Sequence, residues 1–463
     1  MTTANAEISA LFEQGTRSQL AGDAAAAEQA FRQALALRAD IPEVHANPAL
    51  LLDAAGRREE AERHYRECQR LRPDEVQNLL NFGIMCLDQQ RFAEAEALFR
   101  QAAALRPDAA AVWSNLGVLL ACTQREVEAE ACQRRAMACD PGYAAAPFNL
   151  SYLLLRQGRY REAWPLFERR DWYAVLERHL GFPRWQGEDL TGKSLLIGFE
   201  AGHGDMIQFY RYASCLKALR AARVGGLCHP GLKRLFQRLR GLDEVYALDE
   251  DFPAFRWDYW SPPLSLPGYC ATDLDSIPAD LPYLAPPPEE ARQWGERLRD
   301  MPERRVGLIW KGNPRFENDA ERSLLSLRTL APLAGVAGVR FCSLQKGVGT
   351  EEVAALAGQW PLTDYGPELD DFATTAALIV NLDLVISVDT AVAHLAGALG
   401  KPCWLLLPAY KTDWRWLMER RDSPWYPGVM RLFRQSGSGR WDETVREVTR
   451  ELARWAAERP LTS

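Results

Sequence analysis

The sequence has 463 residues, an apolar fraction of 47% and a net charge of −7, with acidic and basic residues dispersed along the chain. This length and composition indicate about three compact units with well-filled cores. The mildly acidic balance and the lack of a basic tract give no support to a nucleic-acid partner.

The N-terminal residues do not resemble a secretory leader, and the cysteines are typical of a protein in a reducing compartment. Asn5, Glu7 and Ser9 stand where a secretory leader would be apolar. No uninterrupted apolar run approaches the roughly 18 residues of a membrane span. The ten cysteines form no C-x-x-C pair, and several occupy apolar positions. We therefore expect a soluble cytoplasmic protein without a disulfide framework or a zinc site.

Residues 8–177 contain a repeat of 34 residues, and small or aromatic residues recur at fixed positions within it. Counted from Ile8, position 20 is alanine in all five copies, position 8 is always small, and position 24 is aromatic in four copies. Small residues let two antiparallel helices approach closely, an aromatic side chain fills the gap to the next repeat, and proline at position 32 ends the second helix. Period and positions resemble the tetratricopeptide repeat. The resemblance implies an α-solenoid of about five repeats over residues 1–177.

Asparagine occupies position 6 in four repeats, as Asn47, Asn81, Asn115 and Asn149. One interpretation is hydrogen bonding along the helix face or solvation in the groove. The other is a ladder of amides that bind a peptide backbone, since each amide can donate and accept. The ladder resembles that of the O-GlcNAc transferases, which implies that these four residues bind an acceptor polypeptide.

Past about residue 180 the period stops and strands alternate with glycine turns and helices. Buried strands are predicted at 195–199, 305–310, 339–344, 384–388 and 403–407, and helices at 206–219 and 391–399. The proline-rich stretch 278–288 divides this half in two. We expect two doubly wound α/β lobes with a crevice between them, over 178–288 and 289–440. Residues 441–463 are expected to form a helix that packs back on the lobes.

Several separated blocks between about 185 and 435 resemble the heptosyltransferase-related glycosyltransferases, which are inverting enzymes of the GT-B fold. The blocks are Gly202-His-Gly-Asp205-Met-Ile-Gln208, Trp310-Lys-Gly-Asn-Pro314 with Arg322-Ser323, Ser343-Leu-Gln-Lys346, and Val388-Asp-Thr-Ala-Val-Ala-His394-Leu-Ala-Gly397. The likeness is closest to bacterial tetratricopeptide-linked members, which also carry segments like Asp413-Trp-Arg-Trp416 and Ser423-Pro-Trp-Tyr-Pro427. Ala201 stands where such members commonly have glutamine, and Lys311 where they have a small residue.

Asp205 is the predicted catalytic residue. It lies at the start of the expected helix, behind a glycine turn, and matches the catalytic aspartate of the resembled family. A carboxylate there can remove the proton from an attacking hydroxyl. The alternative is an N-cap aspartate, which the same position favours.

The helix expected after the strand at 384–388 is the predicted seat of the donor's diphosphate. Thr390 and Ala391 open that helix, so their N–H groups and the helix dipole favour an anion. Asp389 is expected to orient the loop or to hold a ribose hydroxyl. His394 lies one turn along and either contacts the donor or packs beneath the helix.

Arg322 and Lys346 are predicted to bind the leaving phosphate as cations, or else to lie on the surface. The motif blocks add further residues to the predicted nucleotide-sugar site, namely Gly202, Gly204, Gln208, Asn313, Ser323 and Gln345. We expect no metal and no other cofactor, because the Asp-x-Asp pairs at 273–275 and 249–251 lie in loop-like stretches away from these blocks.

Together these features predict an inverting, metal-independent glycosyltransferase. It would move a sugar from a nucleotide-sugar to a hydroxyl of a protein acceptor recruited by the repeats, and family analogy points to flagellin or a surface adhesin. One alternative is a lipid-linked or oligosaccharide acceptor. Another is a non-catalytic repeat scaffold with a degenerate GT-B domain, against which the retention of Asp205, Arg322, Lys346 and Thr390 argues.

Overall fold

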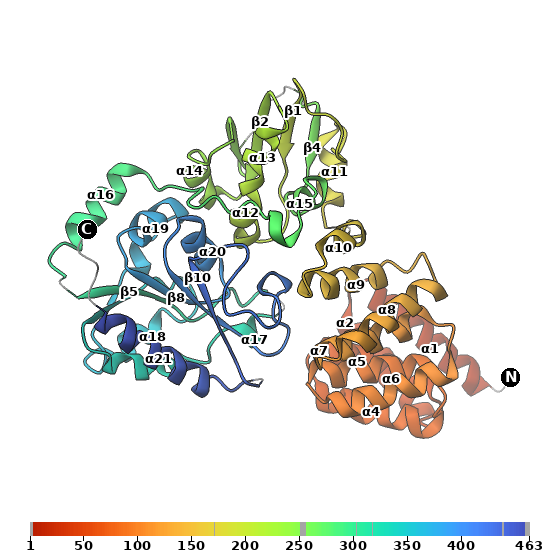
Figure 1. Ribbon diagram of the computed structural model, residues 1–463. Coiled ribbons are helices and arrows are strands. Elements are labelled where there is room, and N and C mark those ends of the chain that lie inside the picture. The colour runs from red at the N-terminus through yellow and green to blue at the C-terminus, as the bar shows by residue number, and fades with distance from the viewer. Residues whose placement is uncertain are drawn as a thin grey trace. The chain divides into compact units, whose positions relative to one another are not determined.

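The computed structural model describes residues 3–170, 172–250, 256–301, 303–316, 318–437 and 439–458. The chain divides into two compact units, Met1–Leu153 and Leu154–Ser463. The first is helical and the second contains two parallel β-sheets (Figure 1). Among the described residues, no helix combines the length and the apolar character that crossing a bilayer requires.

The first unit is a solenoid with two helices in each 34-residue repeat, as the period predicts. Its helices are α1 (Thr3–Leu20), α2 (Ala24–Leu37), α3 (Glu43–Ala54), α4 (Arg58–Leu71), α5 (Val76–Asp88), α6 (Phe92–Leu105), α7 (Ala110–Cys122), α8 (Glu126–Cys139) and the greater part of α9 (Ala145–Arg156).

The small residue at position 8 lies under the aromatic residue at position 24 of the same repeat. A Cβ atom built on Gly83 would lie 2.4 Å from Cε1 of Phe99, so the two helices of this pair pack too closely for a side chain there. The aromatic residue also reaches the next repeat, as Tyr65 does where it stacks on Phe82 with ring centroids 5.5 Å apart. Position 24 therefore closes its own helix pair in addition to making the predicted contact between repeats.

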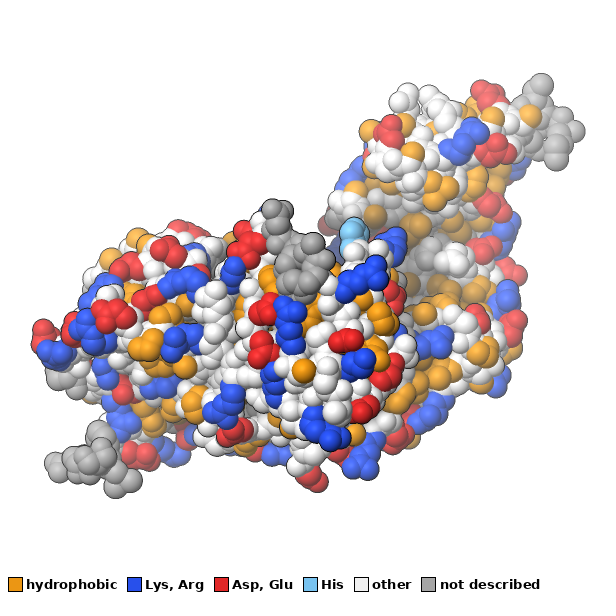
Figure 2. Space-filling view, turned by 90° about the horizontal axis from the view of Figure 1, so that it is seen from above, with side chains coloured by type: hydrophobic (Ala, Val, Ile, Leu, Met, Phe, Trp, Pro, Cys, Tyr) orange, Lys and Arg blue, Asp and Glu red, His pale blue; other side chains and the backbone are white. Residues whose placement is uncertain are grey.

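Ion pairs also join successive repeats. Arg91 lies 2.7 Å from Glu62 of the preceding repeat and also pairs with Glu94 of its own repeat. Arg57 and Arg125 make the equivalent two contacts one repeat away on either side. Half-exposed pairs of this kind each contribute little to stability. However, each arginine can reach a carboxylate in both repeats only when the two repeats are correctly aligned. The face in Figure 2 accordingly shows Lys and Arg side chains among Asp and Glu side chains.

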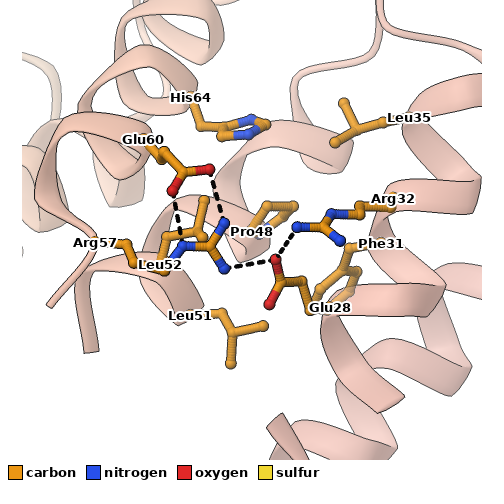
Figure 3. A pocket seen from close by; sticks show the side chains of 10 residues that line it. All are labelled: Glu28, Phe31, Arg32, Leu35, Pro48, Leu51, Leu52, Arg57, Glu60 and His64. Atoms are coloured by element: carbon orange, nitrogen blue, oxygen red, sulfur yellow. Dashed lines mark hydrogen bonds and ion pairs between the residues drawn. The ribbon is translucent and has the colours of Figure 1, made fainter. Parts of the chain in front are cut away.

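Two histidines, His45 and His64, contact each other near the ion pairs of Arg57. His64 and Arg57 line the same pocket (Figure 3). Nε2 of His45 lies 2.9 Å from the carbonyl oxygen of Ala39, so this nitrogen carries the proton. Nδ1 of His45 is then an acceptor and receives the hydrogen bond from Nδ1 of His64, 3.0 Å away. A second proton on the His45 ring would place two N–H groups face to face.

We expect the free energy of unfolding of the first unit to fall as the pH decreases below about 6.5, the ordinary pKa of histidine. Burial, followed by the charge of His45, lowers the pKa of His64, so the unfolded chain takes up protons more readily than the folded one. Chemical unfolding of the full chain at about pH 7.5 and about pH 5.5 measures this loss. His64→Gln keeps a donor to His45 but does not titrate, so its stability should change less between the two pH values. An equal change in both proteins would contradict the assignment.

The second unit begins with the end of the fifth repeat and continues into a lobe that we call the N-lobe, residues 194–276. Helices α10 (Tyr160–Phe167) and α11 (Ala174–Leu180) precede it. Its sheet has the order β3-β2-β1-β4, with all pairs parallel. Its elements are β1 (Ser194–Ile197), α12 (His203–Phe209), α13 (Ala213–Ala218), β2 (Arg223–Cys228), α14 (Lys233–Phe236), β3 (Glu244–Ala247), β4 (Tyr259–Ser261) and α15 (Leu266–Tyr269).

The C-lobe, residues 288–457, has a six-stranded parallel sheet of order β10-β9-β8-β5-β6-β7. Its elements are α16 (Pro288–Arg297), β5 (Arg304–Ile309), α17 (Asp319–Arg322), β6 (Val339–Ser343), α18 (Glu351–Ala355), β7 (Leu362–Asp364), α19 (Phe372–Ile379), β8 (Leu384–Val388), α20 (Ala391–Ala398), β9 (Cys403–Leu407), β10 (Met430–Arg434) and α21 (Asp442–Ala457). Val445, Val448 and Leu452 of α21 belong to the core of this lobe. The parallel α/β architecture predicted for this half, consistent with the GT-B fold, is confirmed.

The predicted helix at 206–219 is wrong in detail. The structure has α12, a 3-10 turn at Tyr210–Tyr212 and then α13. The buried side chain of Arg211 donates from Nε to the carbonyl oxygen of Gln208 at 2.9 Å, which occupies an acceptor that a continuous helix would use. Helical periodicity alone does not reveal this interruption.

Candidate functional site

The strand orders place two loops where a ligand is expected to bind. In each sheet the strand order reverses at the first strand of the lobe. β1 lies between β2 and β4, and β5 lies between β6 and β8. Ligands of open parallel sheets bind beyond the carboxyl ends of the strands at such reversals. The chain leaves β1 into residues 198–202, which lead to Asp205 in α12, and leaves β8 into Asp389 and Thr390.

Asp205 is the third residue of α12, whose N-cap is Gly202. The backbone N–H of Gly202 donates to Oδ2 of Asp205 at 2.9 Å. A carboxylate in the first turn is further stabilised by the partial positive charge of the helix N-terminus. The helix begins three residues earlier than predicted, and Asp205 therefore caps it from within the first turn rather than as the N-cap.

Gly204 lies where α12 of the N-lobe crosses α20 of the C-lobe. A Cβ atom built on Gly204 would lie 2.9 Å from Cδ2 of His394 and 3.3 Å from the Cα atom of Ala391. Only glycine allows this approach, which brings the start of α12 beside the first turn of α20. The predicted contact of Gly204 with the nucleotide-sugar stays a prediction.

The N-terminus of α20 is formed by Thr390, the N-cap, and Ala391. Oγ1 of Thr390 lies 3.0 Å from Oγ of Ser387, and no described side chain caps the helix. Thr390 and Ala391 are both half-buried. Because the first N–H groups of a helix have no partner within it, this turn can bind an anion.

Asp389 and His394 form a buried polar group beside that turn. Nε1 of Trp416 donates to Oδ2 of Asp389 at 2.8 Å, and the Trp416 ring stacks on the imidazole of His394. Nδ1 of His394 lies 2.9 Å from the hydroxyl of Tyr426, and Nε2 lies 3.9 Å from Asp389. Burial, followed by the charge of Asp413, raises the pKa of Asp389 to about 6. His394 thus has the packed environment that was one of its two predicted roles.

Three arginines surround this group. Burial and then the charges of Arg415, Arg211 and Arg322 hold the pKa of His394 well below its ordinary value, so the imidazole is neutral. Arg322 is mostly buried and donates from Nε to Oδ1 of Asp319 at 3.3 Å. Arg322 and Arg415 are both paired with carboxylates, so their charge is partly balanced within the site.

Arg415 connects the two lobes and was not predicted as a site residue. It forms an ion pair with Asp205 and donates to Oε1 of Gln208 at 2.7 Å and to both carboxylate oxygens of Asp413 at 2.9 Å. Arg415 lies in the Asp413-Trp-Arg-Trp416 segment, whose polar residues were not predicted to have a role. The motif was therefore visible, but its partners in the N-lobe, more than 200 residues away, were not.

Gln208 lies in α12, three residues after Asp205, and is fully buried. Its Oε1 accepts from Arg415, whereas its Nε2 has no hydrogen-bond partner among the described residues. Buried donors are nearly always paired in folded proteins. The unpaired amide marks a place where a ligand or water oxygen is expected.

The predicted residues that follow β5 lie in a hydrogen-bonded turn. Oγ of Ser323 accepts from the N–H of Gly312 at 2.8 Å and donates to Asp319 at 2.9 Å. Oδ1 of Asn313 accepts from the N–H of Arg315 at 3.1 Å, and Asn313 is exposed. Ser323 thereby holds Arg322 in place, and among the described residues Asn313 does not hydrogen-bond to the cluster around Asp205.

Gln345 and Lys346 follow β6. Oε1 of Gln345 accepts from the N–H groups of Trp310 and Lys311, both at 3.1 Å, and its Nε2 donates to three carbonyl oxygens. This amide has no capacity left for a ligand and instead joins the loops after β5 and β6. The ammonium group of Lys346 donates to the carbonyl oxygen of Leu369. These two residues are not among those that meet at Asp205.

Within the described residues, no group of three or more His, Cys, Asp or Glu side chains could hold a metal ion. In the first Asp-x-Asp pair, Asp273 accepts from the N–H of Leu274 and pairs with Arg161. In the second pair, Asp251 lies outside the described residues.

The predicted asparagine ladder belongs to the first unit, and all four side chains are half-buried. Nδ2 of Asn149 donates to Ser114 at 3.1 Å and Nδ2 of Asn47 donates to Thr16 at 3.3 Å, in each case in the preceding repeat. The other two bond within their own helices, Asn115 to the carbonyl of Ala111 and Asn81 from the amide of Gln77. Each amide uses only part of its hydrogen-bonding capacity in these contacts.

Comparison with known proteins agrees with both halves of the chain. The tetratricopeptide repeat family matches residues 86–144, and glycosyltransferase family 9 (heptosyltransferase) matches residues 328–406. The predicted resemblance to a tetratricopeptide-linked, heptosyltransferase-like protein is confirmed. The second match covers the segments that carry Gln345, Lys346 and the α20 N-terminus.

Protein FlbA of Caulobacter vibrioides is 29% identical over 329 residues, which are 66% of this chain and 54% of that protein. The chain thus spans about half the length of this relative. Among solved structures, PilF of Pseudomonas aeruginosa is 19% identical, covers 36% of this chain and 76% of its own, and has a TM-score of 0.34. MamA of Desulfovibrio magneticus is 16% identical, covers 38% and 97%, and has a TM-score of 0.33.

Proposed function

We propose that this chain is an inverting, metal-independent glycosyltransferase that moves a sugar from a nucleotide-sugar to a hydroxyl of a protein acceptor. The observation that carries the proposal is the meeting of two loops from different lobes. Asp205 at the start of α12 lies beside the uncapped N-terminus of α20, with Arg415 and Arg322 close by. A base and an anion-binding site are the two parts that this transfer needs.

In the proposed reaction the acceptor oxygen attacks the anomeric carbon on the face opposite the diphosphate. The bond between that carbon and the phosphate oxygen breaks, and the nucleoside diphosphate leaves with the electron pair. Asp205 takes the hydroxyl proton. Its two oxygens each accept one hydrogen bond, Oδ2 from the N–H of Gly202 and Oδ1 from Arg415. A carboxylate has about four lone-pair sites, so acceptor capacity remains for the hydroxyl.

The leaving diphosphate is placed on the first turn of α20. The N–H groups of Ala391 and its neighbours would bind the phosphate oxygens, and the Thr390 hydroxyl can donate to them. Arg322 and Arg415 supply charge that in other transferases comes from a metal ion. Lys346 is the predicted third cation.

Arg322→Ala is expected to weaken binding of a nucleoside diphosphate by about 10- to 100-fold, the range for losing a hydrogen bond to a charged group. Calorimetric titration of the diphosphate measures the loss. Arg315→Ala is the matched control, since Arg315 lies in the same loop and is exposed. Transfer by the wild type should persist in EDTA. Loss of transfer in EDTA, restored by a divalent metal, would contradict the metal-independent site.

The repeats are proposed to recruit the acceptor. Besides the asparagine ladder, position 9 of the second and third repeats, one helical turn further on, carries the partly exposed apolar residues Leu50 at 41% and Ile84 at 36%. Amides for a peptide backbone and apolar side chains for its residues are what an extended polypeptide would use. Flagellin and surface adhesins are the acceptors to test first.

Release of nucleotide tests the class of function. Candidate nucleotide-sugars are incubated with the full chain, with and without acceptor, and the released nucleoside diphosphate is measured. A transferase should release it slowly alone and faster with acceptor. A scaffold with a degenerate site should release none from any donor, and release stimulated only by lipid-linked or oligosaccharide acceptors would remove the protein acceptor from the proposal.

A further inference from the structure

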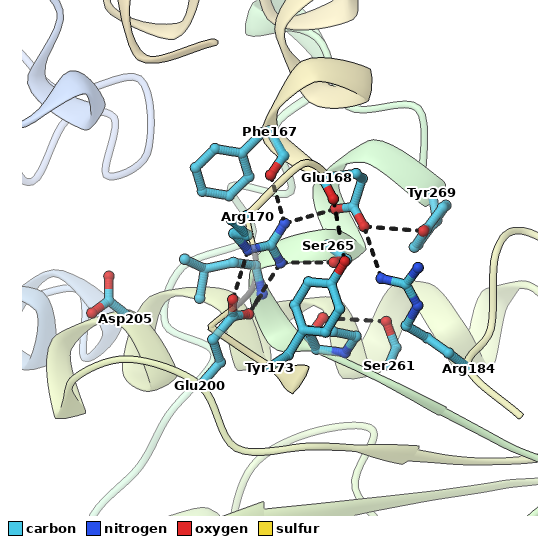
Figure 4. A network of polar contacts seen from close by, with 12 residues as sticks. Phe167, Glu168, Arg170, Tyr173, Arg184, Glu200, Asp205, Ser261, Ser265 and Tyr269 are labelled. Carbon is cyan, nitrogen blue, oxygen red and sulfur yellow. Dashed lines mark hydrogen bonds and ion pairs between the residues drawn. The ribbon is translucent and has the colours of Figure 1, made fainter. Parts of the chain in front are cut away.

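A buried ion pair connects the segment after the last repeat helix to the loop that leads to Asp205. Arg170 follows α10 and Glu200 follows β1, and both side chains are fully buried. Nε of Arg170 donates to Oε1 of Glu200 at 2.6 Å, and Nη2 donates to Oε2 at 3.1 Å (Figure 4). This two-point geometry fixes the orientation of the carboxylate as well as its distance.

The remaining donors of Arg170 are used as well. Nη1 donates to the carbonyl oxygen of Phe167 at 3.1 Å and to Oε1 of Glu168 at 2.8 Å, and Nη2 also donates to Oγ of Ser265 at 2.7 Å. A guanidinium group has five N–H donors, and each therefore has an acceptor. Lysine has three donors on one atom and cannot reproduce the arrangement.

The anchored loop is short and holds a strained residue. Ala201, between Glu200 and the N-cap Gly202, has a φ of +61°, in the left-handed region that side chains rarely adopt. Such a conformation persists only where the surroundings hold it. Glu200 holds the loop on one side and α12 on the other, so the position of Asp205 depends on the anchor at Glu200.

The same segment of the chain reaches the loop that carries Arg415. Nε1 of Trp425 donates to the hydroxyl of Tyr160 in α10 at 3.2 Å, and Trp164 of α10 packs on Trp414 with ring centroids 5.8 Å apart. Trp414 is the neighbour of Arg415, which pairs with Asp205. Residues 160–170 thus contact the supports of Asp205 in both lobes.

We propose that Arg170 is a positioning residue of the transferase, which holds the Asp205 loop through Glu200. By its sequence α10 is the second helix of the fifth repeat. Under this proposal, the segment formed by α10 and Arg170 positions the catalytic loop and does not bind the acceptor. This inference rests on the proposed function of Asp205. Burying a charge pair is costly even when it is well bonded, so stability alone gives little reason for it. Fixing one loop geometry is a reason that the contacts support.

The test compares Arg170→Lys with Arg184→Lys in the full chain. Arg184 also pairs with Glu168 and stacks on Tyr173, but among the described residues it does not contact Glu200. Arg170→Lys should lower kcat by about 10- to 100-fold with little change in the donor KM, as expected for a misplaced catalytic group. In an Asp205→Asn background it should cause almost no further loss, because both changes act on one group. Arg184→Lys should leave kcat near the wild-type value.

Hydrogen exchange of the peptide spanning residues 198–206 gives a readout that does not need activity. Arg170→Lys should speed exchange there, and Arg184→Lys should not. If Arg170→Lys does not fold, Glu200→Gln is used, which leaves Arg170 paired with Glu168. Normal kcat and unchanged exchange in a folded variant would overturn the positioning role. If Arg170→Lys speeds exchange but the wild-type protein transfers no sugar, the loop anchor is supported and the proposed function is refuted.

Discussion

Asp205→Asn is expected to slow sugar transfer by about 10²- to 10⁴-fold, the range for removing a positioned general base. Asparagine keeps the size of the side chain but cannot take up the hydroxyl proton. One of the two hydrogen bonds of the carboxylate, from Gly202 or from Arg415, can be kept by the amide oxygen. Steady-state kcat with a fixed acceptor measures the loss, and donor affinity should change little.

Asp413→Asn is the matched control for this variant. Asp413 is also a carboxylate bound to Arg415, and it lies in the same network. Its replacement should reduce transfer much less, because Asp413 is not placed to accept the proton. Thermal unfolding of both variants separates a catalytic loss from loss of the helix cap. Near-normal turnover of a folded Asp205→Asn protein would remove Asp205 from the catalytic role.

Replacing Asn81, Asn115 and Asn149 together with alanine should weaken acceptor binding by roughly one to three orders of magnitude. Each lost hydrogen bond to a peptide backbone is worth about 0.5–1.5 kcal/mol net. The packing at positions 8 and 20 is untouched, so the solenoid should remain folded. Donor hydrolysis without acceptor should be unchanged, because the donor site is built from the second unit. The measurement is kcat/KM for the protein acceptor below saturation.

The control for the ladder replaces Gln33 and Gln101 with alanine. Both are exposed amides on the second helices of their repeats, outside the ladder. Their loss should leave kcat/KM unchanged. If the ladder variant modifies its acceptor as fast as this control, the asparagines do not bind the polypeptide, and the lipid-linked or oligosaccharide acceptor becomes the better proposal.

The repeat architecture was determined by the sequence alone. Position 8 must be small because position 24 of the same repeat covers it, and this pairing spans only 16 residues, as Gly83 and Phe99 show. Contacts of such short range leave a periodic trace in the sequence. Four of the six C-lobe strands were likewise predicted, because each is a short apolar run bounded by turn residues.

Two of the strands that sequence reasoning missed, β7 and β3, depend on their neighbours for their stability. β7 at Leu362–Asp364 has three residues, all half-buried, and β3 at Glu244–Ala247 has only one fully buried residue. Both lie at the edge of their sheet. A strand of this kind has little apolar pattern of its own, and its place is decided by the backbone hydrogen bonds of the adjacent strand.

The candidate site divides in the same way. Asp205, Thr390 and Ala391 were predictable, because a glycine turn or a strand end directly precedes each helix start and local backbone geometry decides their position. The partners of Asp205 were not. Arg415 reaches it across 210 residues of sequence, and Arg170 acts on its loop through Glu200, 30 residues away. The sequence around a charged side chain does not indicate which distant charge it will pair with. The packing of the two lobes and of α10 therefore decided that arrangement.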